Sequence, residues 1–277
     1  MLVAVGGETA YQWIDLMVDP WYWSASSRVA LIDVSDPADM AVTDGFTVSG
    51  TLTHSRRIGD RLLLVTRYTP EPDGLLPHAT DGADQQSNAD VIEDLDVNDV
   101  LPTITLGDGE TEPLVTVDNC LLPANRDVDD AVYLPTITTI SWTNLRDVSD
   151  RVSLCMADGV QGAHVSSDAV YLSAFDWQET DVGFYDRTVI HKSRLLAEGP
   201  SYTGSASVPG SFCGNPSFLM GEAGGALAVV TTVGTSDPDD PFTHHLTTLG
   251  DGEDFELEQL GQIPSEAAPD KIGKPRE

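Results

Sequence analysis

The sequence predicts an all-β fold built from repeated units of four short strands. Short apolar runs bounded by Gly, Pro, Asp and Ser recur along the 277 residues, whereas apolar residues at helical spacing are scarce. Similar segments also recur at a nearly constant distance along the chain. A fixed period in a strand-rich sequence indicates a propeller or a β-solenoid.

Two sets of segments give the period. The first set consists of strands that end in a polar residue, and its equivalent apolar positions, 111, 50 and 56 residues apart, are Val29, Ile140, Ile190 and Leu246. The second set, with separations of 108 and 57, is "DRLLLVT" from Asp60, "DAVYLSA" from Asp168 and "GALAVVT" from Gly225. The repeat is therefore about 50 to 57 residues long.

The first unit shows the order of strands within one repeat. It runs through "VALIDV", "VTDGFTVSG", "THSRRI" and "RLLLVTRY", the last two joined by a tight turn at Gly59-Asp60. We expect "RLLLVT" to be buried on both faces. Four antiparallel strands are the content of one propeller blade, which needs neighbours on both sides to bury its faces. The sequence thus predicts a β-propeller with about four recognisable blades, closed or incomplete.

A strongly acidic segment at residues 69–135 separates the first two recognisable units. It holds sixteen acidic residues and one basic residue, Arg126. We expect a mobile loop in "DGLLPHATDGADQQSN" and a short amphipathic helix in "ADVIEDLDVNDVLP", ended by Pro102. We interpret residues 1–277 as a single propeller or propeller fragment that contains this insertion, with a flexible tail at 264–277.

The net charge of −31 excludes several classes of partner. An acidic surface gains nothing from counterion release, so nucleic acid and anionic membranes are not expected to bind. With only three lysines, the composition resembles proteins kept soluble in saline surroundings. The sequence contains no run of about 18 apolar residues, so no transmembrane segment is predicted. The first residues lack the pattern of a signal peptide.

The repeated segments also resemble a known family. The stretch "SSRVALIDVSDPADM…SGTLTHSRRIGDRLLLVTRYTP" is similar to the core motif of secreted bacterial and archaeal β-propellers distantly related to WD40 repeats, and so are "VNDVLP", "TVIHKSRL" and "VPGSFCGNPSFLMGEAGGALAVVTT". The resemblance implies a propeller fold and an extracytoplasmic location, secreted or periplasmic, but no activity. An Arg expected in the last segment is Ala228 here. Family members carry further blades, so this chain is expected to close as a small propeller, to stay open, or to associate through open blade edges.

Histidine and arginine side chains near the hairpins are the candidate binding residues. His54 and His164 precede equivalent hairpins and, with Arg56, are expected to line one face. Asp60 or Asp33 is the expected ion partner of Arg56 or Arg57. His191 lies at a family-like position, where we expect a packed or hydrogen-bonded role. His244 and His245 alternate along a strand and should point to opposite faces.

Calcium is the one candidate cofactor, and no other cofactor is expected. Asp94-x-Asp96-x-Asn98 has the spacing that begins a calcium loop, but its sixth position is Asp99 rather than Gly. Other candidate carboxylates lie in "DPDDP", namely Asp237, Asp239 and Asp240. The alternative for all of them is turn chemistry, in which Asp accepts hydrogen bonds from its own backbone.

Cys120, Cys155 and Cys213 show no metal-binding spacing, and we interpret them as buried small residues, with one disulfide as the alternative. Aromatic residues at 13–23 are assigned to packing between blades; if exposed, they would form a docking surface for carbohydrate or protein.

These observations favour a non-catalytic extracytoplasmic binding module whose partner is a protein or a carbohydrate. The sequence lacks the motifs of serine hydrolases, zinc proteases, P-loop enzymes and dinucleotide-binding enzymes. The alternative is a metal-dependent hydrolase or lyase with its site at the propeller axis, which requires His54, His164, Arg56 and two or more Asp side chains to converge in one pocket.

Overall fold

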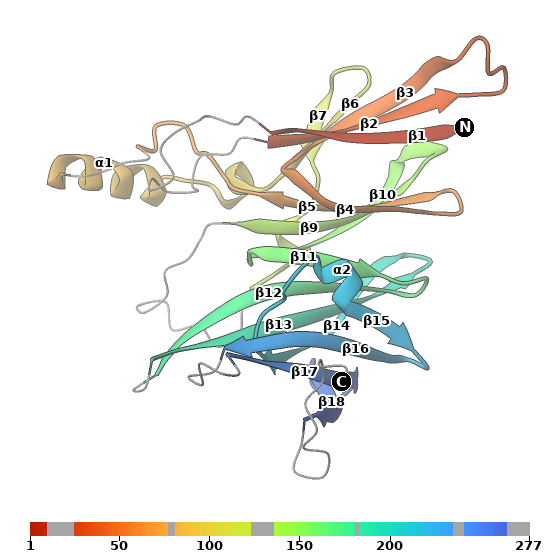
Figure 1. The fold of residues 1–277 in the computed structure, drawn as a ribbon. Helices are drawn as coiled ribbons and strands as arrows, with labels where there is room; N and C mark the ends of the chain where they lie inside the picture. The colour runs from red at the N-terminus through yellow and green to blue at the C-terminus, as the bar shows by residue number, and fades with distance from the viewer. Residues whose placement is uncertain (10–24, 77–80, 123–135, 181–182, 235–240, 265–277) are drawn as a thin grey trace. The chain divides into compact units, whose positions relative to one another are not determined.

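The computed structural model describes residues 1–9, 25–76, 81–122, 136–180, 183–234 and 241–264 (Figure 1). Strands dominate and form four sheets, as the sequence predicted. The chain divides into two compact units, Met1–Gly159 and Val160–Glu277, with two sheets in each.

The first sheet has the order β1-β2-β3-β6-β7, and all its neighbouring strands are antiparallel. Its strands are β1 (Leu2–Thr9), β2 (Ala25–Asp33), β3 (Ala41–Ser49), β6 (Thr103–Leu106) and β7 (Thr111–Pro113). One face of this sheet supplies Val29, Phe46 and Ile104 to the core of the N-terminal unit. The other face is described below, because it carries the candidate site.

The second sheet has the order β4-β5-β9-β10-β8. Its strands are β4 (Thr51–Ile58), β5 (Arg61–Tyr68), β9 (Ile137–Asn144), β10 (Asp147–Met156) and β8 (Cys120–Leu121). The predicted hairpin is confirmed, since β4 and β5 pair across Gly59, which adopts a φ of 62°. Leu62, Leu63, Leu64 and Val65 are all at most 2% exposed, which confirms that β5 is buried on both faces.

The C-terminal unit contains two four-stranded antiparallel sheets. The third sheet consists of β11 (Val160–Val165), β12 (Ala169–Thr180), β13 (Gly183–Leu196) and β14 (Gly199–Pro209). The fourth consists of β15 (Met220–Ala223), β16 (Ala226–Gly234), β17 (Phe242–Asp251) and β18 (Leu257–Ile263). Tyr171 and Ile190 from the third sheet pack with Leu227 and Leu249 from the fourth.

The repeat is confirmed, but its grouping into blades was wrong. Both sets of similar segments fall on neighbouring strands of one sheet, in the pairs β5–β9, β12–β13 and β16–β17. The four strands assigned to the first unit, however, divide between two sheets, because β2 and β3 belong to the first and β4 and β5 to the second. The chain changes sheet at Gly50, whose φ is 100° and where a Cβ would lie 2.5 Å from the Arg67 carbonyl oxygen.

The insertion lies within a sheet rather than between two blades. Its ends join β5 and β9, which are direct neighbours in the second sheet. Within it, β6 and β7 extend the first sheet and β8 extends the second, while α1 (Gly82–Glu93), η1 (Val97–Val100) and η2 (Val117–Asn119) are helical. The segment therefore completes two sheets as well as carrying charge.

The helix of the insertion begins earlier than expected, so the predicted loop at residues 82–88 was wrong. Asp81 caps α1 by accepting hydrogen bonds from the backbone N–H groups of Ala83 and Asp84, and this cap fixes the start. No residue of α1 is buried, and α1 ends at Glu93 rather than at the expected stop, Pro102. A second short helix, α2 (Pro216–Leu219), precedes β15. None of the helices in the described parts of the chain is long and apolar enough to cross a bilayer.

The interpretation of the cysteines as buried small residues holds for Cys155, which is 1% exposed, and was wrong for Cys213, while the alternative of one disulfide is confirmed. Cys120 on β8 and Cys155 on β10 form a disulfide, and their Cα atoms are 4.4 Å apart. Cys213 is a free, exposed thiol. Parallel pairing of β8 with β10 puts Cys120 directly opposite Cys155, a juxtaposition that residue spacing did not reveal.

Candidate functional site

The hairpin residues singled out from the sequence lie on β4 and in the turn after it. His54 pairs with Val65 and Arg56 with Leu63, so the two side chains share one face of an edge strand. Asp60 accepts ion pairs from Arg146 at 2.7 Å and from Arg57 at 4.0 Å. The predicted pairing of Asp60 with an arginine beside the turn is thus confirmed for Arg57.

The two candidate histidines of the C-terminal unit contact tyrosines. The ring of His164 on β11 lies 6.2 Å from that of Tyr171, and Nδ1 of His191 lies 3.3 Å from Oη of Tyr202. His191 therefore has the hydrogen-bonded role expected for it. The convergence of His54 and His164 on one face involves both units and stays a prediction.

The candidate calcium ligands that lie among the described residues are used in local turns. Asp94 follows α1 as its C-cap residue. Asp96 caps η1, and hydrogen bonds from the backbone N–H and then the side chain of Asn98 lower the pKa of Asp96. Asp237, Asp239 and Asp240 lie outside the described residues. In the part of the chain that the structure describes, no group of three or more His, Cys, Asp or Glu side chains is placed to hold a metal ion.

The outward face of the first sheet has a different character from the acidic chain around it. Three rows cross this face in register: Leu2–Ile32–Val42, Ala4–Ala30–Gly45 and Gly6–Arg28–Thr47–Thr105–Thr111. Arg28 is the one charged residue in these rows, and Leu2 and Val42 are 51% and 66% exposed. We call these three rows the neutral face of the first sheet.

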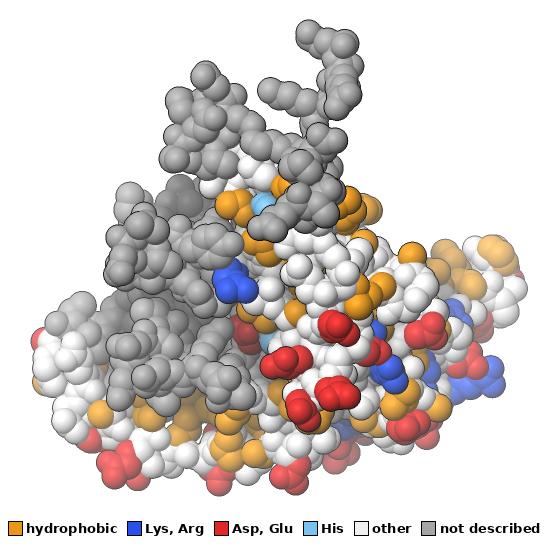
Figure 2. Space-filling view, turned by 90° about the horizontal axis from the view of Figure 1, so that it is seen from below, with side chains coloured by type: hydrophobic (Ala, Val, Ile, Leu, Met, Phe, Trp, Pro, Cys, Tyr) orange, Lys and Arg blue, Asp and Glu red, His pale blue; other side chains and the backbone are white. Residues whose placement is uncertain are grey.

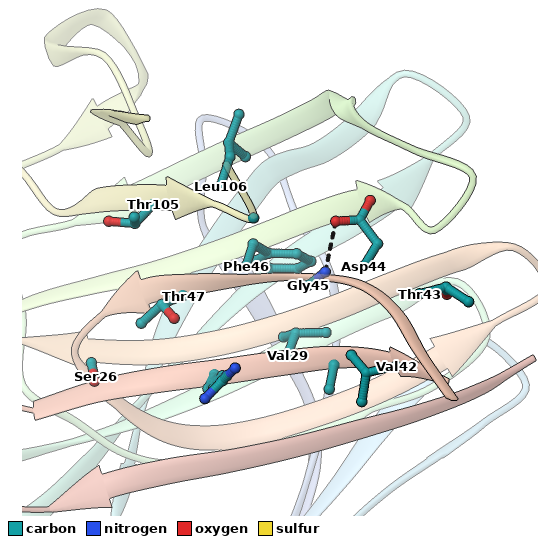
Figure 3. Close-up of a pocket in the computed structure, with 13 residues that line it drawn as sticks. Ser26, Val29, Val42, Thr43, Asp44, Gly45, Phe46, Thr47, Thr105 and Leu106 are labelled. Atoms are coloured by element: carbon teal, nitrogen blue, oxygen red, sulfur yellow. Dashed lines mark hydrogen bonds between the residues drawn. The ribbon is translucent and has the colours of Figure 1, made fainter. Parts of the chain in front are cut away.

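A hollow of about 550 Å³ opens on this face beside β3. Figure 3 shows Ser26, Thr47, Thr105 and Val42 around it, with Asp44 at its margin accepting a hydrogen bond from the Gly45 N–H. The hollow forms where β6 ends at Leu106 while β3 continues past it, because the pairing of these strands stops at Phe46. Its lining offers hydroxyl groups and apolar surface, together with two charged side chains, Arg28 and Asp44.

The fourth sheet carries a matching surface. The rows Gly221–Ala228–Thr248–Gly261 and Val230–Leu246–Ile263 are in register and uncharged, whereas Leu227, Leu249 and Leu257 point into the core of the unit. Glu258 lies at the end of β18, beyond these rows. We call the two rows the neutral face of the fourth sheet. Ala228, where the family resemblance led us to expect an Arg, lies at its centre.

Charged side chains gather instead inside the C-terminal unit. Lys192 Nζ lies 2.7 Å from Asp251 Oδ1 and 5.4 Å from the centre of the Tyr171 ring, and Arg194 pairs with the other carboxylate oxygen of Asp251. Burial alone would raise the pKa of Asp251, but hydrogen bonds from Lys192 and Arg194 outweigh it and lower that pKa. The cluster joins β13 to β17 and has the geometry of a structural ion network.

Tyr171 and Glu222 complete this cluster from β12 and β15. Burial and the negative charge of Glu222 raise the pKa of Tyr171. The Tyr171 hydroxyl and one Glu222 carboxylate oxygen are buried and have no hydrogen-bond partner in the described structure. Tyr171 is therefore held as a neutral phenol whose ring packs in the core of the unit.

Two of these features were missed in the sequence although both left a signal there. Lys192 is one of only three lysines and lies in a strand between the apolar pairs Val189-Ile190 and Leu195-Leu196, and a lysine in such a strand is buried only when it is paired. Each neutral face shows as alternate strand positions held by Gly, Ala, Ser and Thr, as in Ala226-x-Ala228, in a chain with 45 acidic residues. Elsewhere, acidic side chains are spread among hydrophobic ones, as on the described part of the surface in Figure 2.

Comparison with known proteins gives one result for the whole chain. A family model described as a beta propeller domain matches residues 1–276. No curated protein matches the chain.

Proposed function

We propose that this chain, which belongs to the β-propeller domain family, is a non-catalytic binding module that associates through the neutral faces of its first and fourth sheets. The observation that carries the proposal is the contrast between these faces, whose rows hold one charged residue, Arg28, and a chain of net charge −31. Interfaces are depleted of charge at their centres, and an exposed apolar patch marks a surface that another molecule covers.

The partner that fits such a face is another β-sheet, supplied by a second copy of the chain. Glycine, alanine and threonine allow two sheets to approach to about 10 Å, the usual spacing of stacked sheets. Partly exposed apolar rows are present on both faces, Leu2–Ile32–Val42 on one and Val230–Leu246–Ile263 on the other. Contact between unlike faces of two copies is heterologous, so it builds rings or chains of molecules.

The hydrogen bonds and ion pairs of the charged side chains support binding rather than catalysis. Asp60, Asp96 and Asp251 accept hydrogen bonds or ion pairs from neighbouring side chains or backbone groups, and Lys192 is committed to Asp251. The hollow on the first sheet, in contrast, is lined mainly by neutral residues. Such a lining can orient a partner by hydrogen bonds, whereas acid–base chemistry requires titratable groups at the reacting atoms.

An extracytoplasmic location forms the second part of the proposal. The disulfide between Cys120 and Cys155 supports it, because disulfides persist in oxidising compartments and are rare where thiols are kept reduced. Thiol alkylation of freshly lysed source cells, followed by peptide mass mapping, tests this part. Cys120 and Cys155 recovered as one linked peptide pair support it, and recovery of both as alkylated thiols contradicts it.

Light scattering of the purified chain over a range of concentrations tests the association. The wild type is expected to show a mass that rises with concentration. Val42→Glu and Ala228→Glu, each of which places a charge on one neutral face, should raise the concentration needed for association at least tenfold. Val97→Glu is the matched control, since Val97 is 51% exposed on η1, outside both faces. A wild-type chain that stays monomeric throughout, or face variants that associate like the control, would refute the proposal.

A further inference from the structure

An aromatic side chain is displayed to solvent on the turn between β17 and β18. Phe255 is 68% exposed, and its ring stacks on that of Tyr202 from β14 with centroids 6.2 Å apart and planes 23° apart. The ring of His191 also lies 6.2 Å from that of Tyr202. We call His191, Tyr202 and Phe255 the aromatic corner.

The backbone that positions Phe255 adopts an unfavourable conformation. Asp254 and Phe255 have φ angles of 52° and 62°, a region that bulky residues seldom adopt. The turn is fixed to β14 by a hydrogen bond of 3.0 Å from the Ser205 N–H to the Phe255 carbonyl oxygen. Gly204 makes this approach feasible, because a Cβ there would lie 2.7 Å from that same oxygen. The turn therefore leaves a large apolar ring in solvent, where it does not contribute the free energy that burial would give.

Carboxylates surround the exposed ring. Glu253, Asp254 and Glu256 flank Phe255 and are all exposed, and residues 252–264 contain no Lys or Arg. An aromatic face attracts a cation through its quadrupole, and a carboxylate attracts it through its charge. A neutral or anionic ligand could contact the ring but would not be attracted by the carboxylates. The ring and the carboxylates together therefore favour a cationic ligand.

From this arrangement we infer that the aromatic corner binds a cationic side chain of a partner polypeptide, with arginine preferred over lysine. A guanidinium is planar, stacks on an aromatic ring and donates two parallel hydrogen bonds to a carboxylate. The ring of Phe255 supplies the stacking surface, and Asp254 or Glu256 supplies the carboxylate. This surface lies apart from the rows that form the neutral faces, so its role is independent of the proposed association.

Binding of a short fluorescent peptide with two arginines, measured by anisotropy on the full chain, tests this inference. The same peptide with citrulline in place of arginine keeps the planar shape, but a carbonyl oxygen replaces one nitrogen of the guanidinium and the charge is lost, so it should bind at least tenfold more weakly. Phe255→Leu keeps an apolar side chain without an aromatic face, and it should weaken binding of the arginine peptide about 3- to 10-fold. Phe242→Leu is the matched control, since Phe242 is 56% exposed elsewhere on the fourth sheet.

Three results would overturn the inference. Equal affinity of the wild type and Phe255→Leu would assign the binding to the acidic surface as a whole. Equal affinity for the citrulline peptide would exclude recognition of a cation. Binding of tetramethylammonium as tightly as the peptide would point to a small quaternary ammonium ion as the ligand. The mass of Phe255→Leu in light scattering should equal that of the wild type, which separates failure of this site from failure of the sheet faces.

Discussion

Asp60 in the N-terminal unit and Asp251 in the C-terminal unit each bridge two cations, but they do so in different surroundings. Asp60 pairs with Arg57 and Arg146, whose side chains are 41% and 75% exposed. Asp251 pairs with Arg194 and with Lys192, whose side chain is only 7% exposed. Water screens the first set, whereas the second leaves a buried ammonium dependent on one carboxylate.

The two units also differ in the interaction that links their strands internally. The N-terminal unit has a covalent link, Cys120–Cys155, which fastens the insertion to β10. The C-terminal unit has the ion cluster, which fastens β13 to β17. Stability of the first should therefore respond to reductant, and stability of the second to acid.

Removal of the disulfide is expected to have the largest effect. The double variant Cys120→Ser/Cys155→Ser frees a loop closed over a sequence separation of 35, which corresponds to about 3 to 4 kcal/mol of unfolding free energy. Urea unfolding of the full chain measures it, with Cys213→Ser as the control. Dithiothreitol should lower the stability of the wild type and leave the double variant unchanged. Equal sensitivity of both proteins to the reductant would contradict a stabilising link.

Asp251→Asn should cost somewhat less, about 3 kcal/mol, because it leaves the ammonium of Lys192 buried without a counter-charge. Lys192→Met in the same background removes that charge and should restore part of the loss. Urea unfolding at neutral pH measures both variants. If the single and double variants are equally stable, the cost does not come from an unpaired lysine.

The effect of Asp251→Asn should depend on pH. The pKa of Asp251 is lowered in the folded protein, so its contribution to stability is present above the unfolded pKa of about 3.9 and is lost as pH falls through the folded value. The gap in unfolding free energy between the wild type and the variant should therefore be constant from pH 5 to 8 and narrow below about pH 4. A gap that stays constant down to pH 2 would show that the carboxylate charge is not what stabilises the cluster.

The repeat was predictable because each blade must bury the same positions. The apolar anchors Val29, Ile140 and Ile190 are at most 1% exposed, and the need to bury the equivalent position in each unit keeps an apolar residue there. Three of these strands also share a hydrogen bond two residues before the anchor, from Ser27, Thr138 or Thr188 to the carbonyl oxygen of Gly50, Asp158 or Gly210. That Ser or Thr is visible in the sequence, and its partner is not.

What the sequence left open depends on contacts between distant segments. Residue spacing cannot show that Cys120 lies opposite Cys155, or that Asp251 reaches Lys192, because strand pairing and sheet packing bring them together. The grouping into blades was wrong for a related reason. A run of four strands looks the same whether the chain turns within a sheet or changes sheet at Gly50. The candidate histidines were placed on the right strands, but their partners were not foreseen.

Asp60→Asn should have the smallest effect, and it is the sharpest control for the comparison. Its ion pairs are exposed, so their loss should change the unfolding free energy by less than about 1 kcal/mol, and the change should shrink further in molar salt. The variant also lowers the net negative charge by one unit, which relieves repulsion in a chain of net charge −31 and opposes the loss. Urea unfolding at low and at molar salt measures the net change, and both contributions should fade as salt rises. An effect as large as that of Asp251→Asn would mean that burial of the lysine does not distinguish the two clusters, and the contrast between the units would then need another cause.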